Sequence, residues 1–314
     1  MCYKSVVAQM RLGLLFLGNR HFNRAATLES RPSRNQRAIV CRRLGAFGAV
    51  AGAMSVLPGL AGASVPHASQ YDALLVSASN SRTILLGTNI GLLRSTDGGH
   101  SWNAAGFAGR DVLNLVRAGA TIFVAGNGLL DASSNGGRKW HNLRPKGLPD
   151  LHFRDLAADP SNDRVLYATL DTGGLYRSID SGTSFQLVSV AVGPAIDALA
   201  ATPTDLLAGD TSNGIYLSTN GRQWRRTANG MVMGLAVSPS DTRDVLAASW
   251  GISSSSNGGR HWTTVLKSKV MFGSVAWAPN KPRLAYAVGY YDGTLWRSND
   301  LGKTWTRVAL ARVA

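Results

Sequence analysis

The sequence predicts an all-β fold, and three observations support this prediction. A Gly-rich octet that ends in an aromatic residue recurs six times along the chain. The closing aromatic residues lie 38, 45, 39, 38 and 43 positions apart. Short apolar runs of strand length flank every copy of the octet. A repeat of this length built from strands is typical of propeller blades, so we predict a six-bladed β-propeller over residues 71–311.

Five copies of the octet have Ser at the first position, Asp or Asn at the third, Gly at the fifth and an aromatic residue at the eighth, and the fourth copy is one residue shorter. Their third and last residues are Asp97 and Trp102, Asn135 and Trp140, Asp180 and Phe185, Asn220 and Trp224, Asn257 and Trp262, and Asp300 and Trp305. Asp and Asn accept backbone hydrogen bonds in tight turns, and glycine adopts positive φ. We therefore interpret these residues as structural, with the aromatic side chains filling the space between adjacent sheets.

Each predicted blade begins with an inner strand and ends with the strand that follows the octet. The predicted inner strands cover residues 72–77, 112–117, 154–159, 197–202, 233–238 and 273–278. Four of them end at a proline, which stops a strand and begins a turn: Pro160, Pro203, Pro239 and Pro279. No exchange of strands between the two ends of the propeller is visible. Residues 64–70 and the tail 309–314 are the candidates for overlapping the first and last blades.

Residues 37–63 have the pattern of a signal peptide, with a basic start, an apolar centre and a small-residue cleavage site after Ala63. The alternative is an uncleaved membrane anchor, although the apolar run is short for a bilayer span. Arg42-Arg43 also permits twin-arginine export. Residues 1–36 form an extension that indicates either a true start near Val40 or an organelle targeting sequence. We expect a periplasmic or extracellular protein, or a thylakoid lumen protein in a photosynthetic organelle.

The formal net charge of +15 depends strongly on this leader. Residues 64–314 contain 24 Lys and Arg against 17 Asp, and both cysteines and the single glutamate, Glu29, precede them. The remaining excess of basic residues is scattered, so nucleic-acid binding is not predicted. We expect contact with a membrane only through an uncleaved signal, and the sequence leaves the oligomeric state open.

Polar side chains gather where the predicted inner strands begin, on the face opposite the octets. These candidates for a ligand site at the channel mouth are Asp72, Asp111, Arg154, Asp155 and Asp197, in register with Met233 and Gly273. The alternative role for such acids is to cap backbone groups at strand starts. On the same face, a second set provides a possible stacking platform or packing between blades: Trp250, Tyr290, Tyr291 and Asp292.

The octet resembles the Asp-box, or BNR, repeat Ser-x-Asp-x-Gly-x-Thr-Trp of sialidases and other propellers. That resemblance implies an arginine trio, a Phe/Tyr-Arg-Ile-Pro motif, an Asp acid and a Tyr nucleophile activated by Glu. Residues 64–314 contain no glutamate, and Phe153-Arg154-Asp155-Leu156 lacks the Ile-Pro pair. The sialidase catalytic set therefore does not transfer, and we assign no catalytic residue, metal or cofactor.

The segment Gly-Leu-Leu-Arg-Ser-Thr-Asp-Gly-Gly-His-Ser-Trp, residues 91–102, is similar to the photosystem II stability/assembly factors. Members of that family generally have seven blades, whereas six octets are present here. The resemblance implies an exported, non-catalytic scaffold. We therefore predict a binding or assembly module whose channel-mouth face contacts a protein or a glycan. The alternative is a divergent glycoside hydrolase that uses aspartates, since Asp can serve as acid or nucleophile.

Overall fold

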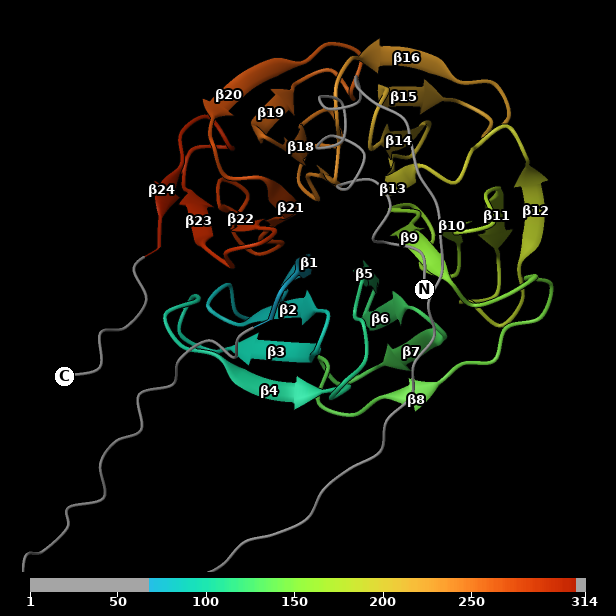
Figure 1. Cartoon of the computed structure of the whole chain (residues 1–314), viewed down its shortest axis with the longest axis horizontal. Helices are drawn as coiled ribbons and strands as arrows, with labels where there is room; N and C mark the ends of the chain where they lie inside the picture. The colour runs from blue at the N-terminus through green and yellow to red at the C-terminus, as the bar shows by residue number, and fades with distance from the viewer. Residues whose placement is uncertain (1–67, 309–314) are drawn as a thin grey trace, which may run out of the picture. The chain divides into compact units, whose positions relative to one another are not determined.

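The computed structural model describes residues 68–308, which form six four-stranded antiparallel sheets arranged as a ring (Figure 1). Each sheet consists of four consecutive strands, so the predicted six-bladed β-propeller is confirmed. The extension 1–36 and the signal segment 37–63 lie outside the described residues. Within residues 68–308 there is no helix, and hence none long and apolar enough to cross a membrane.

The strands of a blade run from the channel outward in chain order. The inner strands are β1 (Tyr71–Val76), β5 (Asn114–Ala118), β9 (Phe153–Ala158), β13 (Ile196–Ala201), β17 (Gly234–Val237) and β21 (Phe272–Trp277). The second strands are β2 (Ile84–Thr88), β6 (Thr121–Gly126), β10 (Leu166–Leu170), β14 (Leu206–Asp210), β18 (Val245–Ser249) and β22 (Ala285–Gly289). The third strands are β3 (Gly91–Ser95), β7 (Leu129–Ser133), β11 (Leu175–Ser178), β15 (Gly214–Ser218), β19 (Gly251–Ser255) and β23 (Leu295–Ser298). The outer strands are β4 (Asn103–Gly106), β8 (His141–Asn142), β12 (Gln186–Ser189), β16 (Arg225–Ala228), β20 (Thr263–Lys267) and β24 (Thr306–Arg307).

The octets form the turns between the third and outer strands, as the sequence predicts. In the first blade, Asp97 Oδ1 accepts hydrogen bonds from the backbone N–H groups of His100 and Ser101, both at 3.0 Å. Ser95 Oγ donates to Asp97 and accepts from the Gly99 N–H at 2.8 Å. The Asn copies keep the backbone bonds: Asn135 Oδ1 accepts from two N–H groups in the second blade. The amide oxygen of Asn is therefore sufficient for this turn.

The octets also join each blade to the preceding one. Gly99 has φ +93°, and a Cβ built on it would lie 2.1 Å from Leu295 of the sixth blade. Trp102 is 3% exposed and belongs to the same apolar cluster as Leu295. Gly259 in the fifth blade makes the equivalent approach to Leu207 of the fourth, also 2.1 Å from a built Cβ. Glycine is favoured at this position, because the left-handed backbone strains other residues and a Cβ would require the neighbouring leucine to shift.

The ring closes by packing rather than by exchange of a strand. β1 contacts β21 and β22, and one apolar cluster contains residues from the first and sixth blades. The Tyr71 N–H donates to Tyr290 O at 2.9 Å, and the Leu74 N–H donates to Ser274 Oγ at 3.2 Å. Of the residues considered for overlap, Ser69 and Gln70 both donate backbone N–H groups to Asn89 Oδ1, while 64–67 and 309–314 lie outside the described residues.

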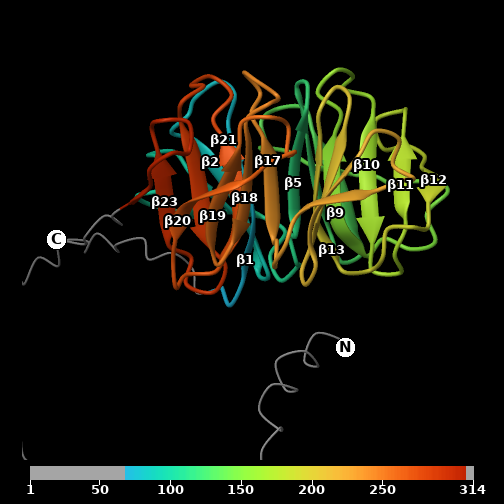
Figure 2. The same cartoon turned by 90° about the horizontal axis from the view of Figure 1, so that it is seen from above.

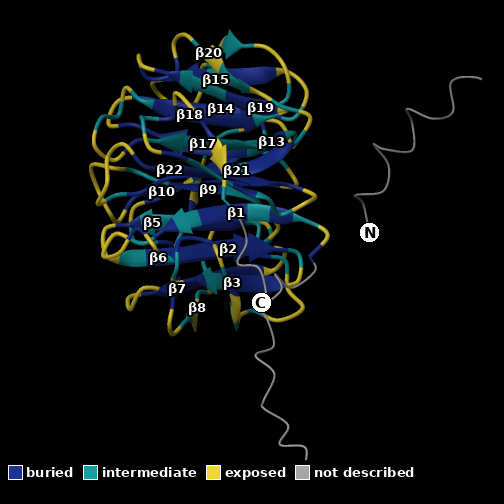
Figure 3. Ribbon diagram, turned by 90° about the vertical axis from the view of Figure 1, so that its left-hand side faces the viewer, coloured by how far each residue is buried: buried dark blue, intermediate teal, exposed yellow. Residues whose placement is uncertain are grey.

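The strands run between two loop-bearing faces (Figure 2). Buried residues concentrate in the three inner strands of each blade, whereas the outer strands and the loops are more exposed (Figure 3). The octets occupy one face. The other carries the loops that lead into the inner strands and those that join the second to the third strands, which we call the mouth face.

The fourth residue of the octet adopts a left-handed backbone conformation even where it is not glycine. The energetic cost of this conformation can be tested by substitution. Ser181 has φ 58°, whereas the equivalent residue of the second blade is Gly136, at φ 74°. Left-handed backbone costs a non-glycine residue about 1–2 kcal/mol, and the greater chain entropy of glycine offsets part of this. We expect Ser181→Gly to raise the free energy of unfolding by about 0.5–1 kcal/mol in urea titrations.

The matched control is Gly136→Ser, because no atom lies within 4 Å of a Cβ built on Gly136 and only the backbone term changes. This variant should lose a similar amount of stability. Shifts of the same sign in both variants would contradict the interpretation.

Candidate functional site

The polar residues at the channel mouth are aimed by irregularities in the inner strands. β1 pairs with β2 through Tyr71 and Ala73, so Asp72 between them is an extra residue in a bulge. Arg154 in β9 and Asp197 in β13 occupy equivalent bulges, and Gly273 is the bulged residue of β21. A bulge re-aims one side chain without shifting the rest of the strand. The predicted register of Asp72, Arg154, Asp197 and Gly273 is therefore present, and the bulge is its structural cause.

Arg154 lies in a network with two aspartates. Its Nη1 donates to Asp197 Oδ1 at 2.9 Å, and its Nε forms an ion pair with Asp171 Oδ1. The side chains of Arg154 and Asp197 are 19% and 16% exposed, so the pair is only partly accessible to water. Asp171 follows β10 and was not among the residues chosen from the sequence. The sequence could have indicated Asp171, because it lies in a loop between a second and a third strand, and these loops belong to the mouth face.

Asp155 connects two blades. Its Oδ1 accepts a hydrogen bond from its neighbour Leu156 N–H, and its Oδ2 accepts from the Leu199 N–H of β13. Burial raises the pKa of Asp155 to about 8, although these hydrogen bonds act in the opposite direction. Asn114 makes a similar bridge, since its Nδ2 donates to Arg154 O at 3.1 Å. The contacts of Asp155 are those of a residue that satisfies backbone groups.

Asp72 differs from these aspartates. Its side chain lines the channel, and its Oδ2 is buried without a hydrogen-bond partner among residues 68–308. Burial, followed by the like charges of Asp111 and Asp197, raises its pKa to about 8. An aspartate in this state holds a proton near neutral pH and releases it when a positive group approaches.

Asp111 lies beside the channel rather than in its wall. It precedes β5 by three residues, and its Oδ2 accepts a hydrogen bond from Asn127 Nδ2 at 2.8 Å. In the second blade, the residues that line the cavity begin at Leu113. Asp111 therefore contributes negative charge to the mouth without providing part of its surface.

The aromatic candidates divide into an exposed pair and a buried residue. Trp250 and Tyr291 are 56% and 59% exposed, at the second-to-third strand loops of the fifth and sixth blades. Tyr290 is 9% exposed, and its OH accepts a hydrogen bond from Gln70 Nε2 at 2.8 Å. Asp292 Oδ1 accepts from Thr294 N–H and Oγ1, which is an Asx turn. Of these candidates, Trp250 and Tyr291 present exposed aromatic surface on this face.

The inner strands enclose a channel cavity of about 400 Å³. Asp72, Asp155 and Asp197 supply carboxyl groups toward the mouth, and Arg117, Asp159 and Asp163 line the opposite end. Leucine, alanine and valine side chains from all six inner strands supply most of the remaining wall. Among residues 68–308, no group of three or more His, Cys, Asp or Glu is placed to hold a metal ion. The arrangement is suited to a small polar or cationic group with an apolar stem.

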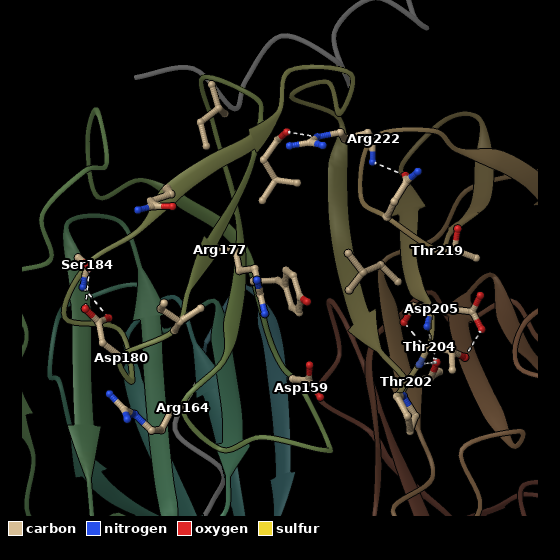
Figure 4. Close-up of a pocket in the computed structure, with 18 residues that line it drawn as sticks. Asp159, Arg164, Arg177, Asp180, Ser184, Thr202, Thr204, Asp205, Thr219 and Arg222 are labelled. Carbon is tan, nitrogen blue, oxygen red and sulfur yellow. Dashed lines mark hydrogen bonds between the residues drawn. The ribbon is translucent and has the colours of Figure 1, made fainter.

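A second hollow, of about 760 Å³, lies between the third and fourth blades at the octet side (Figure 4). Arg164, Arg177 and Arg222 are on its wall, and the Arg177 guanidinium lies 5.9 Å from the centre of the Tyr167 ring. Sequence reasoning did not identify this hollow. The feature of the sequence that could have indicated it is Arg177, which directly precedes the third octet, but the facing residues come from another blade.

These features define a class of protein, the six-bladed Asp-box β-propeller with a polar channel mouth. The family described as "Photosynthesis system II assembly factor YCF48" matches residues 65–312. The chain therefore belongs to the photosystem II assembly factor YCF48 family.

Two solved structures and one curated relative show how far the likeness extends. The structure "YCF48 bound to D1 peptide" has a TM-score of 0.50 and 18% identity, over 77% of this chain and 82% of that one. A chain of the nidogen/laminin complex has a TM-score of 0.60 and 12% identity, over 73% and 93%. Both likenesses concern the fold alone. A xyloglucanase of Hypocrea jecorina (strain QM6a) is 29% identical over 206 residues, which is 57% of this chain but only 22% of the relative's length.

The raised pKa of Asp72 predicts a pH-dependent change in stability. An acid whose folded-state pKa is raised stabilises the fold below its unfolded-state pKa and loses that contribution as pH rises toward 8. Asp72→Asn removes the ionisation, so its advantage over the wild type should grow between pH 5 and pH 8. We expect a net gain of about 2 kcal/mol at pH 8, measured by urea unfolding, with relaxation of the channel limiting the effect.

Asp97→Asn is the control for this titration. Although burial raises the pKa of Asp97, its hydrogen bonds, that from the Ser101 side chain first, lower it to about 2. The contribution of Asp97 is therefore complete above about pH 4 and constant from pH 5 to pH 8. An unchanged difference between Asp72→Asn and the wild type over this range would contradict the assignment.

Proposed function

We propose that this protein is an exported, non-enzymatic binding module that holds a segment of a protein partner on the mouth face. Membership of the YCF48 family supports an assembly role, and a YCF48 structure has been solved bound to D1 peptide. The observation that carries the proposal is the pair of exposed aromatic side chains, Trp250 and Tyr291, beside a channel whose mouth is acidic. Partly exposed aromatic residues are common anchors of protein contacts.

The surface has the chemistry of a peptide site. Trp250 and Tyr291 come from adjacent blades, and Ile90, 37% exposed, occupies the corresponding loop of the first blade. These three apolar groups therefore follow consecutive blades around one side of the mouth. The Arg154, Asp171 and Asp197 network and the free carboxyl of Asp72 add polar groups toward the axis. Apolar side chains provide contact area for a bound segment, and a few polar groups fix its orientation.

Loss of the two rim aromatics should weaken partner binding. We expect the double variant Trp250→Ala with Tyr291→Ala, purified through a tag from the source cells, to recover at least tenfold less of a partner seen with the wild type. Quantitative mass spectrometry of the co-purified proteins measures this. Alanine at a buried aromatic anchor commonly costs 2 kcal/mol or more of binding energy, so a tenfold loss is a moderate expectation.

Ile179→Ala is the matched control, because Ile179 is 61% exposed but lies in an octet on the opposite face. This variant should recover the partner as well as the wild type does. Equal losses in the control and the double variant, or unchanged recovery in both, would exclude the mouth face as the binding surface.

A divergent glycoside hydrolase is the second candidate, favoured by the xyloglucanase relative and by the protonated state of Asp72. A carboxyl that holds its proton near neutral pH has the property required of a general acid. However, the second carboxylate, Asp197, is engaged by Arg154, and Asp155 accepts backbone hydrogen bonds. A free nucleophile or base beside Asp72 is therefore not evident among residues 68–308.

Enzyme assays separate the two candidates. We expect the purified protein to release no reducing sugar from xyloglucan and no sialic acid from sialosides. Turnover that disappears in both Asp72→Asn and Asp197→Asn would replace the binding module with a hydrolase. Turnover that persists in both variants would indicate a contaminating activity.

A further inference from the structure

The channel mouth contains a carboxyl group without a counter-charge. Asp72 is the bulged residue of β1, lines the channel cavity, and has a buried Oδ2 that accepts no hydrogen bond from residues 68–308. A buried carboxyl oxygen without a donor is unfavourable, because desolvation is not repaid by a hydrogen bond. The carboxyl therefore lacks compensation, and the cavity beside it gives a cation from outside access to its other oxygen, Oδ1.

The groups around Asp72 are negative or neutral, so a positive charge beside its carboxyl group would be stabilised further. Asp111 before β5 and Asp197 on β13 both act on it as like charges, and Tyr290 after β22 is a neutral phenol whose pKa is raised by burial and then by Asp72. Of the strands that contact β1, β2 and β21 carry no ionisable side chain. β22 carries Tyr286, and β5 carries Arg117 toward the end of the strand away from the mouth. Arg154, the cation of the channel mouth, already forms ion pairs with Asp171 and Asp197.

The cavity favours one kind of cation. Metal binding lacks support, because residues 68–308 contain no group of three or more His, Cys, Asp or Glu placed to hold an ion. A guanidinium binds best to two accessible carboxylate oxygens, whereas Oδ2 of Asp72 is covered. An ammonium is a compact charge that can bind at a single oxygen, and its aliphatic stem can lie along an apolar wall. Leu113, Met233 and Leu235 supply such a wall in the cavity.

We propose that the channel mouth binds a primary ammonium group, with the carboxylate of Asp72 as its acceptor and Asp111 and Asp197 as additional negative charge. The ammonium belongs to a lysine side chain of the protein partner, whose flanking residues contact Trp250 and Tyr291 on the rim. The assignment of the ammonium to a lysine of a protein partner rests on the function proposed above. The ammonium site itself rests only on the structure of the channel.

Binding is linked to the release of a proton. Asp72 must lose its proton to pair with the ammonium, and its pKa is about 8. The ionised fraction of such a group rises about tenfold between pH 7 and pH 9, while a lysine, with a pKa near 10.4, remains largely charged. Affinity should therefore increase about tenfold over this range, with protons released to the buffer at pH 7.

Calorimetric titration of the full chain with the peptide acetyl-Gly-Lys-Gly-amide tests this. We expect binding that is about tenfold tighter at pH 9 than at pH 7, and a heat at pH 7 that depends on the ionisation enthalpy of the buffer. The peptide with norleucine in place of lysine should bind at least tenfold more weakly at pH 9. Asp72→Asn should lose the same factor and the pH dependence, whereas Asp97→Asn should bind as the wild type does.

Each other outcome has a definite meaning. Equal binding of the lysine and norleucine peptides, or unchanged binding by Asp72→Asn, would overturn the ammonium site. If the peptide does not bind but the rim variants still lose the partner, this inference fails and the proposed function stands. If the peptide binds as expected but partner recovery is unchanged in the rim variants, the site stands and the proposed function fails.

Discussion

The fold depends on one repeated contact, in which the octet turn of each blade packs against the blade before it. Five octets place their glycine against a leucine of the preceding blade, as Gly99 does against Leu295 and Gly302 against Leu246, and in the third octet Phe123 and Leu143 take that place beside Gly182. The closing aromatic residue adds apolar surface to the same interface, and its burial is a main source of stability in such packing. The first blade packs against the sixth through the same contact, so the ring closes in the same way as the other neighbouring blades are joined.

This contact also determines where a site can form. The Ser and Asp or Asn side chains of the octets form hydrogen bonds within their own turns, as Ser95 and Asp97 do, and are not available to a ligand. The mouth face lacks such turns, and there the bulges of β1, β9 and β13 direct Asp72, Arg154 and Asp197 toward the axis. Negative charge therefore collects at the channel although the chain as a whole is basic. Local geometry, rather than net charge, decides which ligand the mouth can accept.

Much of this arrangement follows from the sequence, because the octet is a local signal that repeats. Ser95, Asp97 and Gly99 form one turn within five residues, and pattern alone identifies it. The alignment of inner strands likewise placed Asp72, Arg154 and Asp197 together. What the sequence did not reveal depends on contacts between blades. Three features require residues that are distant along the chain to meet. Asp155 accepts a hydrogen bond from the Leu199 N–H, Tyr290 accepts one from Gln70, and the hollow beside Arg177 lies between two blades.

The absence of strand exchange between blades has a topological consequence. Each sheet is a continuous piece of chain, and the first and sixth blades meet through side-chain packing and a few hydrogen bonds, such as that from Tyr71 N–H to Tyr290 O. All six interfaces share this packing, to which the second and third blades add a backbone bridge between Lys146 and Ser184. None of the six four-stranded sheets has to be split to open the ring. Each blade is therefore a self-contained unit of consecutive chain, and the chain could begin or end between any two blades without dividing a sheet.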